Sequence, residues 1–180
     1  MDQSITQWAN SFAGSNAILD RIMVAASQYG VPLLILFVAL QWWSKRERLS
    51  IRHTCVAAGL SFLIGLGLNQ IILLFVHRVR PYDAGLTHLI IGRSGDWSFP
   101  SDHATASLAI VFAFLFHRVW RRAFILSAGA SLICFSRVYV GTHYASDVLG
   151  GAITGIIAAV VVRSIYWEGT WADRLITSIL

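Results

Sequence analysis

Five long apolar stretches alternate with short polar segments along the chain. Each stretch is close to the ~20 residues that an α-helix needs to cross the hydrocarbon core of a bilayer. The stretches cover residues 22–43, 54–76, 101–120, 122–139 and about 145–166. This pattern predicts an all-α fold, a polytopic transmembrane helix bundle of about five spans. The bundle is expected to form a single membrane-embedded domain over residues 1–180.

Residues 1–20 have a different pattern, in which isolated apolar side chains are mixed with Ser, Thr, Asn and Gln. This segment is too polar to span a membrane and predicts an amphipathic N-terminal helix on the outer membrane surface. It has no basic leader, and no small-residue cleavage site follows a short apolar core. A cleaved signal peptide is therefore not expected.

Composition supports an integral membrane protein. The chain is 56% hydrophobic and only 13% charged, with a mean hydropathy of +0.64, whereas about a quarter of the residues of a soluble domain are charged. The formal net charge of +5 does not predict nucleic-acid binding, because the basic residues are divided among loops with different roles. Cys55 and Cys134 lie within predicted spans, without a disulfide framework or metal-binding spacing, and are expected to be free thiols.

Basic residues indicate the orientation of the spans. They concentrate in residues 44–53, in residues 117–122 and in the tail after the fifth span, which the positive-inside rule assigns to the cytoplasm. The C-terminus is then cytoplasmic, the N-terminus lies outside, and the two remaining loops, 76–100 and 138–144, lie on the outer face. The rule does not explain the arginines of these outer loops, which are Arg78, Arg80, Arg93 and Arg137.

A polar tetrapeptide, Pro100-Ser101-Asp102-His103, opens the third apolar stretch. Ser101 is placed to cap the helix, and free backbone N–H groups at a helix start attract anions. His103 adds an ionisable ring within the first turn. These features suit a phosphate, although the same tetrapeptide could also serve only to start a helix after a proline.

A second polar cluster joins the fourth and fifth spans. Ser136 and Arg137 end the fourth span, and His143 and Asp147 follow at the start of the fifth. Residues four apart share a helix face, so the Asp147 carboxylate could hold one ring nitrogen of His143 and leave the other free. A His–Asp pair at this spacing can also be a surface contact, but an ionisable residue at that membrane depth favours function.

The five-span topology brings these clusters to one side of the membrane, together with Arg80 at the exit of the second span. Arginines supply permanently charged forks for phosphate oxygens, and two histidines can supply a nucleophile and a proton donor. This set suits phosphoryl transfer through a covalent phosphohistidine. The acidic residues of the core are too scattered to suggest a two-metal site, so neither a metal nor a cofactor is expected. They are Asp83, Asp96, Asp102 and Asp147.

Over roughly residues 70–150 the chain resembles the type 2 phosphatidic acid phosphatase superfamily, whose signature reads K-x6-R-P, P-S-G-H and S-R-x5-H-x3-D. The third motif fits at every fixed position, Ser136, Arg137, His143 and Asp147. The second fits except that Asp102 replaces glycine. The first is incomplete, because Arg80-Pro81 fits but Leu73 stands at the lysine position.

The resemblance implies a role for each matching residue. His143 would attack phosphorus, Asp147 would orient it, and His103 would protonate the leaving oxygen. Arg80, Arg137 and Ser101 would bind the phosphoryl group. Two positions depart from the family: Arg78 or His77 could replace the missing lysine charge, and Asp102 could tune His103 or position a proton.

The run Ser-Phe-Pro-Ser-Asp-His over 98–103, the incomplete first motif and the small size resemble the bacterial undecaprenyl-diphosphate phosphatase branch. This implies a protein of the bacterial inner membrane whose active site faces the periplasm and whose substrate is a polyprenyl diphosphate lipid. Removal of the terminal phosphate would recycle the lipid carrier of cell-wall synthesis. The alternatives are a phosphatase for phosphatidylglycerol phosphate, phosphatidate or lipid A, and a non-catalytic membrane protein that binds lipid phosphate.

Overall fold

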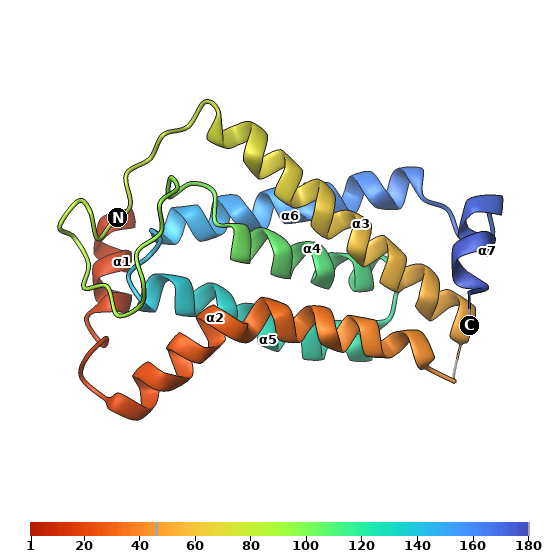
Figure 1. The fold of residues 1–180 in the computed structure, drawn as a ribbon, viewed down its shortest axis with the longest axis horizontal. Helices are drawn as coiled ribbons and strands as arrows, with labels where there is room; N and C mark the ends of the chain where they lie inside the picture. Colours follow the sequence, from red (N-terminus) through yellow and green to blue (C-terminus); the bar gives the residue numbers. More distant parts are fainter. Residues whose placement is uncertain (46, 180) are drawn as a thin grey trace.

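The apolar stretches form five long helices, α2 to α6, which run side by side along the molecule (Figure 1). The structure is a computed structural model that describes residues 1–45 and 47–179, so Arg46 of the basic segment lies outside the described residues. In the described part all regular secondary structure is helical, and no strand is present. Its helices are α1 (Asp2–Asn10), α2 (Ala17–Leu40), the 3-10 helix η1 (Gln41–Trp43), α3 (Arg48–Leu73), α4 (Asp102–Phe116), α5 (Trp120–Tyr139), α6 (Ala145–Ile165) and α7 (Trp171–Thr177).

Three segments are long and apolar enough to cross a membrane by themselves, Ala17–Trp43, Arg48–Leu73 and Ala145–Ile165. Helix α4 is apolar but has only 15 residues, shorter than the stretch predicted from sequence. It packs against α3, α5 and α6 and buries most of its side chains among them. The short central helix is therefore surrounded largely by protein, and the polar ends of the predicted stretch, including Ser101 and His117, lie outside it.

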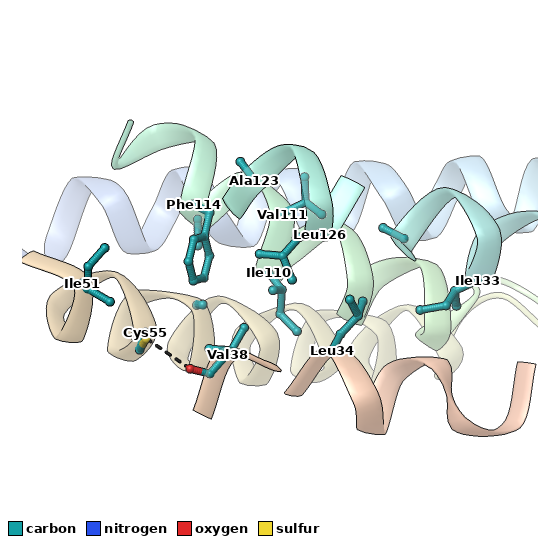
Figure 2. Packing of buried hydrophobic residues seen from close by; sticks show 13 residues of the cluster. Leu34, Val38, Ile51, Cys55, Ile110, Val111, Phe114, Ala123, Leu126 and Ile133 are labelled. Atoms are coloured by element: carbon teal, nitrogen blue, oxygen red, sulfur yellow. Dashed lines mark hydrogen bonds between the residues drawn. The ribbon is translucent and has the colours of Figure 1, made fainter. Parts of the chain in front are cut away.

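The main hydrophobic core joins α2, α3, α4 and α5 (Figure 2). Phe114 of α4 and Leu126 of α5 are almost completely buried there. Cys55 lies in the same cluster, with its thiol 3.4 Å from the Val38 carbonyl oxygen. Both cysteines are free thiols, as predicted.

Helices α4 and α6 approach each other closely because α6 carries two glycines at the contact. A Cβ at Gly151 would collide with the carbonyl oxygen of Ser101, and one at Gly155 with that of Thr105. Small residues allow such backbone contact between membrane helices. The contact brings the start of α4 beside the start of α6, where the backbone N–H of Ser101 donates to the Asp147 carbonyl at 3.0 Å.

Helix α1 is amphipathic as predicted, but its polar face packs against the protein instead of facing water. Thr6 and Asn10 are buried against the protein, whereas Ile5, Trp8 and Phe12 are exposed. The helix is also shorter than expected, since Asn16 caps a new helix and residues 17–20 already belong to α2. The reason is that the polar side chains of α1 find partners in the loops at this end of the bundle.

Candidate active site

The three polar clusters meet at one end of the bundle, as the five-span topology predicts. A pocket of about 90 Å³ lies between the C-terminal end of α3, the loop 74–101, the start of α4, the end of α5 and the loop that leads into α6. Leu73, Arg80, Ser94, Asp96, Pro100, Asp102, His103, Arg137 and His143 line it. The membrane topology has thus gathered residues that are up to 70 positions apart in the chain.

His143 stands in the tight loop between α5 and α6. Gly141 precedes it with a φ of +83°, a backbone conformation that glycine adopts without strain. The His143 side chain is buried, and its Nδ1 lies 2.8 Å from the carbonyl oxygen of Ser98. Because a carbonyl can only accept, Nδ1 carries the proton, and Nε2 keeps its lone pair. This is the tautomer that a nucleophile at Nε2 requires.

Asp147 holds the loop of His143 with a fully buried carboxylate. It accepts hydrogen bonds from Arg78 Nη1 at 2.6 Å, Ser98 Oγ at 2.5 Å and the Tyr144 backbone N–H at 2.8 Å. Its Oδ2 lies 3.6 Å from His143 Nδ1, farther than the Ser98 carbonyl. Asp147 therefore fixes the ring largely through Ser98, rather than by the direct hydrogen bond that the spacing suggested.

Ser98 is the site residue that sequence reasoning missed. It contacts His143 with its carbonyl and Asp147 with its hydroxyl, although these residues lie 45 and 49 positions away. The only signal was its place at the start of the run 98–103 that carries part of the family resemblance. No spacing rule connects that run to residue 143, so its role depends on the tertiary structure.

Arg80 belongs to the loop 74–101 and is buried against the His143 loop. Its guanidinium donates to the carbonyl oxygens of Asp96, Trp97 and Thr142 at 2.9–3.3 Å, and to the Asp96 carboxylate at 2.8 Å. Its Nη1 also lies 3.3 Å from His143 Nε2. Arg80 therefore places a positive charge beside the free ring nitrogen, where a phosphoryl oxygen would sit.

Asp96 is a second group that was not expected at the site. Burial alone would raise the pKa of its carboxyl, but hydrogen bonding from Ser94 and the charge of Arg80 outweigh this effect and lower the pKa overall. The ionised carboxylate offsets part of the charge of Arg80 within the pocket.

Arg137 and Ser101 each have one buried polar atom for which the described residues provide no hydrogen-bond partner. Arg137 is buried on the pocket wall, where Nη1 donates to the Ser27 hydroxyl and Nε has no hydrogen-bond partner among the described residues. Ser101 occupies the N-cap position of α4, but its buried hydroxyl makes no capping bond and has no partner in the described part of the chain either. The capping role expected for its side chain is therefore wrong. Arg137 lines the pocket and remains able to meet oxygens of a bound phosphate, whereas Ser101 is buried next to the pocket-lining residues Pro100 and Asp102 and is not itself part of the wall.

His103 and Asp102 lie in the first turn of α4 and line the pocket with His143. The Asp102 carboxylate accepts a hydrogen bond of 2.6 Å from Asn69 of α3. Asn69 also donates to Thr105 at 2.9 Å, which ties α3 to the start of α4. Asp102 thus faces the anion site with one oxygen already occupied.

Arg78 does not reach the pocket. Its guanidinium pairs with Asp147 and with Asp2 of α1, both at 2.6 Å, and lies 3.8 Å from the centroid of the Tyr144 ring. His77 is also outside the pocket wall, 5.1 Å from the Trp97 ring centroid. Neither residue replaces the family lysine, since two carboxylates hold Arg78 behind Asp147, and Leu73 itself lines the pocket at the lysine position.

The surroundings of His143 keep its ring neutral. Burial lowers the pKa of His143 to about 4; the nearby Asp147 carboxylate opposes this, and the charges of Arg137 and Arg80 add to it. At neutral pH the ring therefore holds a single proton, at Nδ1. A neutral imidazole flanked by two guanidinium groups can attack an anionic phosphoryl group.

Comparison with known proteins agrees with this geometry. A family model described as the PAP2 superfamily matches residues 54–171, more than half of the chain. The chain belongs to the PAP2 superfamily. It is 36% identical to undecaprenyl-diphosphatase BcrC of Bacillus subtilis over 87% of this chain and 80% of that protein. It is 32% identical to the putative undecaprenyl-diphosphatase YbjG of Escherichia coli over 77% of this chain and 67% of that protein.

A solved structure shares the fold. The crystal structure of a transmembrane PAP2-type phosphatidylglycerolphosphate phosphatase from Bacillus subtilis superposes with a TM-score of 0.67 and covers 91% of this chain and 83% of its own. Sequence identity is 23%, so this likeness concerns the fold alone. Together, the family, the relatives and the membrane-spanning helices identify an integral-membrane lipid phosphatase.

Proposed function

We propose that this PAP2 phosphatase removes the terminal phosphate of undecaprenyl diphosphate and releases undecaprenyl phosphate. Two relatives with this activity in their names, BcrC and YbjG, match most of the chain. The observation that carries the chemistry is the pocket itself, where the lone pair of His143 Nε2, two arginines and a second histidine face one small volume.

The first step transfers the phosphoryl group to the protein. His143 Nε2 attacks the terminal phosphorus, and an N–P bond forms as the bond from phosphorus to the bridging oxygen breaks. The electron pair of that bond goes to the bridging oxygen, and His103 supplies the proton that it takes up. Undecaprenyl phosphate leaves, and His143 carries the phosphoryl group as a cationic phosphoimidazole whose Nδ1–H still faces the Ser98 carbonyl.

The second step returns the protein to its starting state. His103, now neutral, takes a proton from water while the water oxygen attacks phosphorus. The N–P bond breaks, its electron pair returns to Nε2, and inorganic phosphate leaves. Arg80 and Arg137 stabilise the charge that develops on the phosphoryl oxygens in both steps, and they need little reorganisation because the surrounding loops already hold them.

The placement in the membrane follows from the charge pattern. With the basic segments 44–53 and 117–122 in the cytoplasm, the pocket opens toward the periplasm of a bacterial inner membrane. The apolar tail of the substrate stays in the bilayer while its diphosphate reaches the ends of α3 to α6. In this position the protein would recycle the lipid carrier of cell-wall synthesis.

The decisive test is phosphate release by the purified protein in detergent with EDTA present. The wild-type protein is expected to hydrolyse undecaprenyl diphosphate, and His143→Ala to lose this activity by at least ~1,000-fold, because no nucleophile remains. His88→Ala, at an exposed position, is the matched control and should keep full activity. Full activity in a folded His143→Ala variant would exclude the phosphohistidine mechanism.

A substrate panel then separates the proposed substrate from other lipid phosphates. Phosphatidylglycerol phosphate, phosphatidate and lipid A are assayed beside undecaprenyl diphosphate at equal surface concentration. The proposal expects the highest kcat/KM for undecaprenyl diphosphate. A higher kcat/KM for another lipid would leave the phosphatase chemistry in place and change the substrate.

A further inference from the structure

The N-terminal helix α1 binds the catalytic loop through one polar face. Asp2, Thr6 and Asn10 are spaced four residues apart and share this face. Asp2 and Thr6 accept hydrogen bonds from the backbone N–H groups of Ser146 and Ala145, at 2.9 and 3.0 Å. These two groups begin α6 and have no partner within that helix.

At the other end of this polar face of α1, Asn10 binds Tyr139, the residue that precedes the His143 loop. Asn10 donates to the carbonyl oxygen of Tyr139 at 2.7 Å and to that of His88 at 2.9 Å. Tyr139 is the last residue of α5, so α1 grips the chain on both sides of residues 140–144. The loop that presents His143 is therefore bracketed by a helix that lies outside the family signature.

A chain of charges links α1 to the catalytic histidine. Asp2 Oδ2 lies 2.6 Å from Arg78 Nη2, and Arg78 Nη1 lies 2.6 Å from Asp147 Oδ1. Asp147 in turn holds Ser98 and lies 3.6 Å from His143 Nδ1. Ser146 supports the link, because its hydroxyl lies 2.6 Å from both Asp2 and Arg78.

Asp2 changes the charge balance of this chain. Burial alone would raise the pKa of the Asp2 carboxyl, but hydrogen bonds from Ser146 and Arg78 lower it overall, so the group is ionised. Without Asp2, Arg78 would cancel the charge of Asp147. With Asp2, two carboxylates and one guanidinium leave a net negative charge behind His143. Asp147, the member of this group nearest the ring, is fully buried, and burial strengthens the effect of its charge, whereas Asp2 and Arg78 are each about 30% exposed.

We propose that Asp2 is a positioning residue for phosphoryl transfer, which acts through Arg78 to hold Asp147 and the His143 loop and to preserve negative charge behind the imidazole. The inference rests on the proposed phosphohistidine function, because the charge matters when His143 becomes cationic on accepting the phosphoryl group. Asp2 is separated from the pocket by Arg78 and Asp147, so it should affect kcat much more than KM.

The primary test is Asp2→Asn, which keeps the size of the side chain and an acceptor for Ser146 but removes the charge. We expect kcat to fall about tenfold, at the lower end of the losses seen when outer partners of metal-bound histidines are removed. KM for undecaprenyl diphosphate should stay unchanged. The matched control is Gln3→Ala on the exposed side of α1, which should behave as wild type.

A double-mutant cycle with Arg78→Gln tests whether Asp2 acts through Arg78. If it does, Asp2→Asn should cause little further loss of kcat once Arg78 is replaced. Equal losses in both backgrounds would overturn the coupling. An unchanged kcat in Asp2→Asn would overturn the proposal, whereas a wild-type protein inactive on every lipid phosphate would overturn the proposed function instead.

The acid limb of kcat/KM distinguishes a charge effect from a loosened loop. This limb reports His143 in the free protein, whose pKa is about 4. Removing the negative charge of Asp2 should move the limb to lower pH, whereas a loosened loop would hydrate the ring and move it up toward the ordinary value of 6.5. An upward shift would therefore contradict the proposal. The other ionisable groups around the ring, Arg80, Asp96, Asp102, His103, Arg137 and Asp147, are the same in both proteins.

Discussion

Individual residues at the site do more than one task, and Ser98 is the clearest case. Its carbonyl selects the tautomer of His143, and its hydroxyl satisfies the buried Asp147 carboxylate. A buried carboxylate without hydrogen-bond donors is costly, so Asp147 can remain in place because Ser98, Tyr144 and Arg78 all donate to it. The catalytic histidine is thus held by a network rather than by one partner.

Leu73 offers a direct test of the departure from the family signature. We expect Leu73→Lys to place an ammonium group on the pocket wall, where a charge-assisted hydrogen bond to phosphate contributes ~1.5–3 kcal/mol. Inhibition by inorganic phosphate or vanadate should become at least ~10-fold stronger. The control is Leu74→Lys, at the exposed neighbouring position, which should leave the inhibition constants of phosphate and vanadate unchanged. Unchanged or weaker inhibition in Leu73→Lys would show that Leu73 does not face the bound phosphate.

At the scale of elements, the short helix α7 was not expected from sequence, and a buried polar cluster holds it against α3. Asp173 of α7 accepts hydrogen bonds from Tyr166 at 2.6 Å and from the Gly169 backbone at 2.7 Å, and lies 2.8 Å from His53 Nδ1. The His53 ring stacks on Tyr166 with centroids 4.6 Å apart. The several hydrogen-bond partners of the Asp173 carboxylate therefore fix the position of the seven-residue helix α7.

Removing this carboxylate should release α7 without affecting catalysis. Asp173→Ala is expected to destabilise the folded protein by ~3–5 kcal/mol, the usual cost of breaking a buried pair by removal of one partner. The melting temperature in detergent and protease cleavage near residue 168 measure the effect. Activity per folded molecule should persist, since α7 lies at the opposite end of the bundle from α1 (Figure 1), and the catalytic His143 loop is beside α1. Glu168→Gln, at an exposed position nearby, is the control, and an equal loss there would refute the assignment.

At the scale of the whole molecule, the short helices close the two ends of the five-helix bundle, α1 beside the pocket and α7 at the other end (Figure 1). The apolar side chains that remain exposed on α2 and α6 suit a lipid environment rather than water. The buried charged groups therefore lie at the two ends of the bundle, where the loops supply backbone hydrogen-bond partners for them.

Stability should fall on acidification, because the folded protein keeps buried histidines neutral, His143 and His117 among them. Burial lowers the pKa of both His143 and His117, each to about 4, below the ordinary value of 6.5. Between these two pKa values the unfolded chain binds more protons than the folded protein. The free energy of unfolding therefore rises with pH across this window, and this contribution is lost as pH falls from about 6.5 to 4. For the fully buried His143 the effect reaches ~1.4 kcal/mol per pH unit, or ~3–6 °C in Tm.

The melting temperature measured at several pH values in one detergent tests this expectation. His143→Asn should flatten the dependence, whereas His88→Asn, at an exposed position, should not. A wild-type Tm that stays constant from pH 6.5 to 4 would contradict it.

Much of this protein can be read directly from its sequence. Hydropathy predicted the five long helices, and the resulting topology predicted that the three motifs meet at one end of the bundle. Both predictions depend only on local composition, on the charges of the loops and on the thickness of a bilayer. The motif spacing identified His143, His103, Arg80 and Arg137, which all line one pocket.

Only the tertiary structure decided how these residues are held. It turned the polar face of α1 toward the protein, placed Arg78 behind Asp147 instead of in the pocket, and gave Ser98 a part in the site. The reason is that a buried charge takes whichever donors and acceptors the folded chain brings within about 3 Å. Those partners come from loops and helices far apart in sequence, so no local pattern records them.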